Sequence, residues 1–227
     1  MYLDRIVVVR CEEYITCAMS HRTGTQSCGA FDLDLSMAKG FTKNGSPQRV
    51  ESKVQPWFER RFDFNFPIAR FPNICVRLRG TPARLEEILK DAATDLFTAK
   101  PDGKWSAQEH AGHLFDLEPL WMARVEDFLT DGDTLTVMDL TNRKTDEANH
   151  NSRTLREIVA DFRAARLHLV SCIGRLQPKV FASSRLHPRL RQSIRLVDHL
   201  VFVAEHDDHH LARICEIVDP SSNTWIF

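Results

Sequence analysis

The sequence lacks the features that mark three special classes of protein. No apolar run approaches the roughly 18 residues that a membrane-spanning helix needs, and residues 6–9 are too short for the apolar region of a signal peptide. Its 30 basic and 31 acidic residues leave a net charge of −1, so no overall basic field attracts nucleic acid or an anionic membrane. Its six cysteines form no C-x-x-C pair, which argues against a disulfide scaffold and for reduced thiols in a cytoplasm.

What remains is an ordinary globular composition, with 43% hydrophobic and 27% charged residues in 227. Residues 1–53 differ from the rest, because they hold three of the six cysteines and no sustained period of 3.6 or 2. They predict either a poorly ordered tail or a true translation start nearer Met37 or Val54. We therefore expect one domain over residues 54–227.

The pattern becomes helical after an aromatic and basic lead-in at residues 57–64 (WFERRFDF). A short helix is expected around residues 72–79, ending at Gly80. Thr81 would then cap a new helix that has Pro82 in its first turn. Apolar residues at helical spacing continue this helix to about residue 96.

Capping boxes mark two further helix starts. Ser106-x-x-Glu109 opens a helix to about residue 129, with a kink expected at Pro119. Thr154-x-x-Glu157 opens another after a long loop over residues 130–153, and a last helix is expected over residues 193–218. No strand is expected after residue 57, so the predicted fold is all-α, a four-helix bundle with a long crossover loop.

Histidines in the last expected helix and in the helix that Ser106 opens suggest a metal site. His206 and His210 stand four residues apart, one helical turn, so that both rings can reach one ion. Counting 100° per residue places this pair on or beside the apolar stripe of the helix and His209 further round. A single inward histidine is usually a hydrogen-bonded core residue, but several together are costly to bury unless a metal satisfies them.

A third ligand would come from the helix that Ser106 opens. His110 lies at the centre of its apolar stripe and His113 at the edge, but Pro119 disturbs the phase. Spacing therefore leaves His110 and His113 as equal alternatives. Three imidazoles with an open position are typical of a catalytic metal rather than a structural one.

Five segments together resemble one protein family. Residues 105–114 (WSAQEHAGHL) and 204–214 (AEHDDHHLARI), with the lead-in and the loop segments 139–142 (DLTN) and 147–149 (EAN), closely resemble the DinB-like (DinB/YfiT) superfamily of proposed metalloenzymes. The resemblance covers about residues 55–218 and leaves out the N-terminal segment.

The resemblance implies a metal held by His113, His206 and His210, with His110 as a neighbour. It also implies a four-helix bundle of unusual topology that is frequently dimeric, so a homodimer is expected. The ion would be zinc, nickel or iron, all of which accept three imidazoles. Characterised branches of the family use mycothiol or bacillithiol, which implies a metal-dependent enzyme, and specifically an S-transferase that joins a low-molecular-weight thiol to a small-molecule substrate. A hydrolase that activates water is the less favoured alternative, because no clear acid or base residue is present.

Other charged residues give less definite predictions. No catalytic acid or base is assigned: Asp207 follows His206 where zincins carry their glutamate, but a role beside the ligands or a solvated charge fits equally. Arg185, Arg189 and their neighbours form a basic stretch, either a solvated face or dimer rim or a contact for an anionic substrate. One alternative function is a non-catalytic, stress-associated bundle whose ion locks its helices. Nucleic-acid binding ranks last, because the chain lacks basic balance and stacking aromatics.

Overall fold

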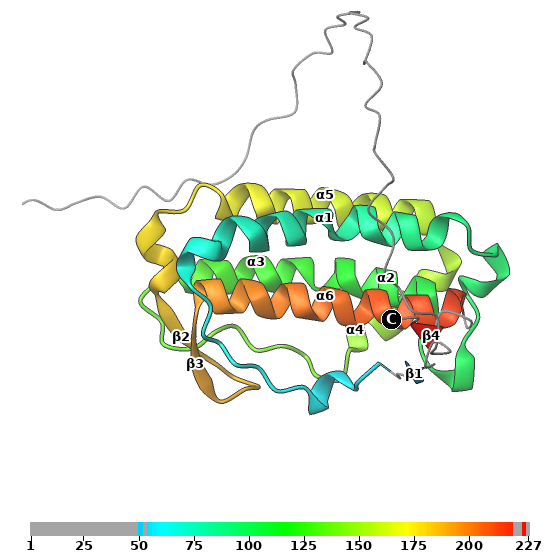
Figure 1. Cartoon of the computed structure of the whole chain (residues 1–227), viewed down its shortest axis with the longest axis horizontal. Helices are drawn as coiled ribbons and strands as arrows, with labels where there is room; N and C mark the ends of the chain where they lie inside the picture. Colours follow the sequence, from blue (N-terminus) through cyan, green and yellow to red (C-terminus); the bar gives the residue numbers. More distant parts are fainter. Residues whose placement is uncertain (1–49, 52–53, 220–223, 226–227) are drawn as a thin grey trace, which may run out of the picture. The chain divides into compact units, whose positions relative to one another are not determined.

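Four long helical segments pack together in the computed structural model, which describes residues 50–51, 54–219 and 224–225. They are α1 (Phe71–Lys90), α2 (Ala107–Asp116) continued by α3 (Glu118–Asp127), α5 (Leu155–Ile173) and α6 (Leu196–Val218). In Figure 1 α1 lies beside α5, and α2 lies beside α6. Helix α3 contacts α5. The prediction of an all-α four-helix bundle is confirmed. The expectations for the tail concern residues almost wholly outside the described part, so they stay predictions.

Short elements connect and flank the bundle. The 3₁₀ helices are η1 (Trp57–Glu59), η2 (Ile68–Arg70), η3 (Thr94–Leu96), η4 (Pro101–Gly103), η5 (His150–Ser152) and η6 (Pro178–Ala182), and one short α-helix, α4, spans Arg143–Glu147. Strand β1 (Val50–Glu51) pairs with β4 (Thr224–Trp225). Strands β2 (Ser184–His187) and β3 (Gln192–Arg195) form an antiparallel hairpin. The long crossover loop therefore carries α4 and η5, which matter for the site below.

Both predicted capping boxes are present, and the kink falls where proline requires it. The side chains of Ser106 and Thr154 accept hydrogen bonds from the backbone N–H of Glu109 and Glu157. Each glutamate side chain in turn accepts one from the backbone N–H of the capping residue. Pro119 has no N–H for the preceding turn, and the helix divides at Leu117 into α2 and α3.

The predicted helix break at Gly80 is wrong, because α1 runs through both Gly80 and Pro82. Pro82 removes the hydrogen bond that the carbonyl of Leu78 would accept within the helix. The guanidinium of Arg166, on α5, donates to that carbonyl instead, with Nη1 3.4 Å from the oxygen. A contact between α5 and α1 thus satisfies the carbonyl that Pro82 leaves without its helical hydrogen bond.

The expectation of no strand after residue 57 is also wrong. Ser184 pairs with Arg195 and His187 with Gln192, and Arg191 in the turn adopts a left-handed φ of 52°. The last helix consequently begins at Leu196 rather than at residue 193. Two four-residue strands are too short to give a period that can be distinguished from a loop.

Two buried apolar clusters fill the bundle, and a polar layer separates them. Along α6, residues Leu196 to Ala204 belong to the first cluster and Leu211 to Val218 to the second. The other helices change cluster at the same level, α1 between Leu78 and Leu85 and α5 between Leu169 and Phe162. The residues at this level are polar, and they form the candidate site and its support. None of the described helices is long and apolar enough to cross a membrane.

Candidate metal centre

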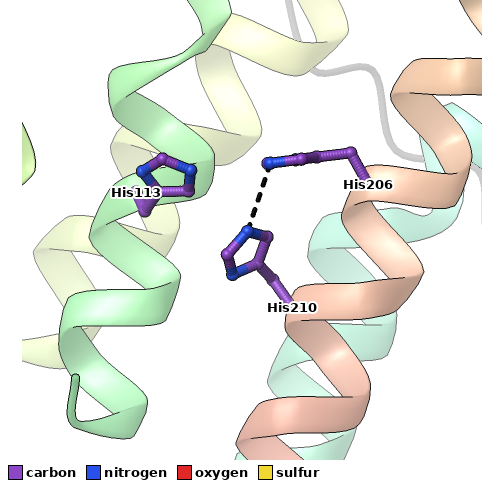
Figure 2. A group of neighbouring side chains, drawn as sticks. All are labelled: His113, His206 and His210. Carbon is purple, nitrogen blue, oxygen red and sulfur yellow. Dashed lines mark hydrogen bonds between the residues drawn. The ribbon is translucent and has the colours of Figure 1, made fainter. Parts of the chain in front are cut away.

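Three imidazoles meet in the polar layer between α2 and α6. His113 comes from α2, and His206 and His210 come from consecutive turns of α6 (Figure 2). Each offers one ring nitrogen, and the three nitrogens lie within 4.8 Å of one another. The exposed fractions of the three residues are only 3%, 2% and 6%. The three residues selected through the family resemblance are thus brought together, in a group that could hold a metal ion.

Hydrogen bonds determine which nitrogen of His113 carries a proton. Its Nδ1 lies 3.0 Å from the hydroxyl oxygen of Thr145, in α4, and that hydroxyl donates its only proton to Asp116 at 2.9 Å. The Thr145 oxygen must therefore accept from Nδ1–H of His113. This leaves the lone pair on Nε2 of His113, available for an ion.

Asp116 is the anchor of this chain of bonds. Its carboxylate also accepts from Nε2–H of His150, in η5, at 2.8 Å. Burial raises the pKa of Asp116, but the bonds from His150 and Thr145 outweigh it and hold the pKa below its usual value. A carboxylate that fixes a ligand histidine through a hydroxyl is the kind of support that metal sites use to orient imidazole.

The two histidines of α6 are oriented differently. Nε2 of His210 lies 3.2 Å from Nε2 of His206, while Nδ1 of His210 lies 2.9 Å from Nδ1 of His110. His110 therefore contacts the far side of the His210 ring instead of joining the three-residue group. Nδ1 of His206 is buried and has no hydrogen-bond partner among the described residues.

Burial keeps these imidazoles neutral. Desolvation, with smaller contributions from neighbouring histidines, lowers the pKa of His113 to about 4 and that of His110 to about 3. The pKa values of His206 and His210 are lowered well below their ordinary value, again mainly by burial. Neutral rings keep the lone pairs that metal ligation requires.

Tryptophan side chains surround the cluster. Trp57 packs edge-on against His206, with ring centroids 5.0 Å apart, and Trp121 contacts the same ring at 5.6 Å. Trp105 lies 4.7 Å from His113 and donates its indole N–H to Asp146. The aromatic lead-in thus runs over α6 and covers the site from outside the bundle.

Two acidic residues of α6, Asp207 and Asp208, are engaged in ion pairs with arginines of other helices. Asp207 is 0% exposed and is paired with the buried guanidinium of Arg166, and it also accepts from the Thr81 hydroxyl at 2.8 Å. Arg166 further bonds Glu118 at 2.6 Å. Asp208 pairs at the surface with arginines of α1. Asp207 therefore binds helices together, and the proposal of a solvated charge at this position is wrong.

Sequence reasoning missed the supporting residues. Thr145, Asp116, His150 and Arg166 carry no recognisable spacing, because they come from separate elements. The only available signal was that α4 and η5 flank the EAN segment of the family resemblance. His209, which was placed further round the helix, is 8% exposed and packs against Trp57. Burial lowers its pKa to about 4.

Comparison with known proteins identifies the family. The sequence profile described as the DinB superfamily matches residues 77–214, which is more than half of the chain. The chain belongs to the DinB superfamily. No curated protein matches it significantly. Among solved structures, this DinB protein resembles YfiT from Bacillus subtilis with a TM-score of 0.63 and 17% identity, covering 72% of this chain and 94% of YfiT. YfiT is described as a probable metal-dependent hydrolase with an unusual four-helix bundle topology.

A glycine next to His113 provides a test of how tightly this DinB site is packed. A Cβ at Gly112 would overlap the ring of His150. We expect Gly112→Ala to lower the free energy of unfolding by about 1–3 kcal/mol, because the His150 ring is buried and must move.

Gly80→Ala is the matched control, since nothing lies within 4 Å of a Cβ there. Within helix α1 this change should raise the free energy of unfolding by about 0.5–1 kcal/mol. Urea unfolding of both variants measures the contrast. Equal stabilisation by both substitutions would contradict the packing of His150 against α2.

Proposed function

We propose that His113, His206 and His210 bind one divalent transition metal and that the protein is a metal-dependent enzyme with a small-molecule substrate. The observation that carries this proposal is the meeting of three buried, neutral imidazoles from two helices. Burying three unliganded imidazoles side by side is costly, and a single ion would satisfy them together.

The spacing of the α6 pair fits an ion. Two ligand nitrogens, each about 2.0–2.1 Å from zinc in a tetrahedral site, lie roughly 3.3 Å apart. Nε2 of His206 and Nε2 of His210 are 3.2 Å apart. Zinc, nickel and iron all suit such a donor set. Three protein ligands leave at least one position open for a substrate or water.

Two reaction classes suit the site. When bound, such an ion acts as a Lewis acid and lowers the pKa of a water or thiol at its open position. Hydrolysis is supported by the likeness to YfiT. S-transfer from a low-molecular-weight thiol is supported by the donor set, since no carboxylate joins the three histidines among the described residues and Asp207 is engaged by Arg166.

In either reaction the chain's own residues hold and shield the reactants. Thr145 and Asp116 fix the ring of His113, His110 contacts the ring of His210, and the surrounding indoles limit water. A cytoplasmic homodimer, implied by the family resemblance and the cysteine usage, remains a prediction.

Elemental analysis of the purified protein tests the proposal. We expect about one transition-metal ion per wild-type chain and a loss of most of that metal in His113→Ala, His206→Ala and His210→Ala. His168→Ala, on the exposed face of α5, serves as the control and should retain full metal content. Equal metal in all four variants would refute the assignment.

The non-catalytic alternative is tested by removing the ion. If the ion only locks the helices, chelation should abolish cooperative unfolding, because binding energy would then be folding energy. An enzyme site of the proposed kind should lose and regain its ion while circular dichroism shows the bundle intact.

A further inference from the structure

A pocket adjoins the candidate metal centre. Its volume is about 150 Å³, and His206 forms part of its wall. Four aromatic rings line it, from Trp57, Phe58, Trp121 and Phe202. Val137 and Leu140 of the crossover loop add further apolar surface. The pocket therefore offers a compact apolar space against a proposed metal ligand.

One cation in this pocket, Arg189, has buried nitrogens without a hydrogen-bond partner among the described residues. Nε and Nη2 of Arg189 are buried and make no hydrogen bond within the described part of the chain. The guanidinium carbon lies over the rings of Trp57, Phe58 and Phe202, at 5.3, 5.3 and 5.4 Å from their centroids. Burial lowers its pKa, and no carboxylate contributes to that shift. Buried donors left unpaired are costly, and at functional sites they often await a ligand.

The surroundings of Arg189 are positively charged. Arg124 also lines the pocket and is 1% exposed, and it is held by the carbonyl of Thr136 at 3.0 Å and by Nε2 of His187 at 3.1 Å. Burial chiefly, and repulsion by the nearby Arg189 guanidinium in addition, lower the pKa of Arg124 to about 10. An anion in the pocket would relieve both effects.

Arg189 and His206 contact the same indole. The guanidinium lies 5.3 Å and the His206 ring 5.0 Å from the Trp57 ring. A molecule whose anionic group meets Arg189 therefore has its remaining atoms within the aromatic walls and beside the proposed metal ligand.

We infer that this pocket binds the carboxylate of a substrate with a compact apolar or aromatic body, and that Arg189 is the residue that recognises it. This inference rests on the proposed function, whose substrate class it names. The planar fork of arginine pairs with both oxygens of a carboxylate. A small pocket with aromatic walls suits a singly charged carboxylate on an apolar group better than the strongly hydrated phosphate dianion.

Benzoate is a suitable probe, and the metal-free protein is the decisive sample because benzoate cannot then bind through an ion. Titration followed by tryptophan fluorescence should show saturable benzoate binding, with benzyl alcohol and inorganic phosphate binding at least tenfold more weakly. Arg189→Gln should weaken benzoate binding by roughly 10- to 100-fold, and Arg189→Lys should fall between that variant and wild type. Arg191→Gln is the matched control, since Arg191 is exposed in the same hairpin turn, and it should bind like wild type.

Circular dichroism accompanies each titration, and the zinc content of each protein is measured before its metal is removed, so that a misfolded variant is recognised. If Arg189→Gln keeps its fold and still binds benzoate as tightly as wild type, the inference is overturned while the metal assignment stands. Tighter binding of phosphate or benzyl alcohol than of benzoate would overturn it as well. A wild-type protein that contains no metal when purified would instead count against the proposed function alone, because benzoate binding is measured on metal-free protein.

Discussion

Replacing Arg166 by methionine should lower the free energy of unfolding by about 3–5 kcal/mol, one of the largest losses available to a single substitution in this chain. Arg166 is 0% exposed, and its guanidinium pairs with Asp207 and Glu118, which are also buried. Its removal would leave two carboxylates in the core without a counterion. It would also remove the donor that satisfies the Leu78 carbonyl at Pro82. Urea unfolding at pH 7 measures the loss.

Arg163→Met provides the matched control on the same helix. Arg163 pairs with Glu86 at the surface, where the two side chains are 38% and 52% exposed, so its loss should cost at most about 1 kcal/mol. A triple variant that also makes Asp207→Leu and Glu118→Met should recover much of the stability, because no unpaired charge remains. Similar small losses from Arg166→Met and Arg163→Met would show that the buried pairs are not the connection between helices that their geometry indicates.

Acidification should destabilise the metal-free protein by several kcal/mol between pH 7 and pH 5. A buried imidazole that stays neutral has a lower pKa folded than unfolded, so the unfolded chain binds protons first as pH falls through about 6.5. Stability is therefore present above pH 6.5 and lost below it, by about 2 kcal/mol per group at pH 5. The residues of this kind that are under 10% exposed are His113, His187, His199, His206, His209 and His210.

The pKa shift of one carboxyl group has the opposite effect on stability as the pH falls. Burial raises the pKa of Glu118 to about 7, so this group gains a proton in the folded state first and offsets roughly one histidine. The remaining loss approaches the whole stability of an ordinary domain, about 5–15 kcal/mol. Chemical unfolding of chelator-treated protein at several pH values measures it, and a flat profile from pH 7 to pH 5 would contradict it.

His199→Leu isolates one histidine from the rest. His199 is 0% exposed, packs against Trp121 and Phe128, and has no hydrogen-bond partner on either nitrogen among the described residues. The leucine variant should be more stable than wild type at pH 7 by about 1–2 kcal/mol, since two unsatisfied nitrogens leave the core. Its gain in the free energy of unfolding over wild type should grow by about 2 kcal/mol at pH 5, because the variant has one histidine fewer that takes up a proton only when the chain unfolds.

Local features of the fold were predictable because their causes are local. The capping boxes at Ser106 and Thr154 and the break before Pro119 depend on residues within one turn. The continuity of α1 through Pro82 depends instead on Arg166, far along the chain, and no local rule can include that contact. The short β2–β3 hairpin likewise depends on pairing between strands, and strands of four residues are too short to be predicted from their sequence pattern.

The site was predictable to a similar extent. The spacing of His206 and His210 on one helix is enough to pair them. Choosing between His110 and His113 required the family resemblance, because both rings face α6 and the break at Leu117 blurs the helical phase. The sequence alone does not decide whether the basic stretch that contains Arg189 is a solvated face or dimer rim or a contact for an anionic substrate. Only the three-dimensional structure shows that the donors of Arg189 are buried among aromatic rings.

The distribution of the ligands along the chain has a consequence for biosynthesis. His113 belongs to the second long segment of the bundle, whereas His206 and His210 belong to the last. A growing polypeptide on the ribosome offers at most one of these three imidazoles until α6 is synthesised, and the complete set only when α6 emerges. We therefore expect metal loading to follow translation, and unfinished chains to have little capacity to withdraw free ions from the cell.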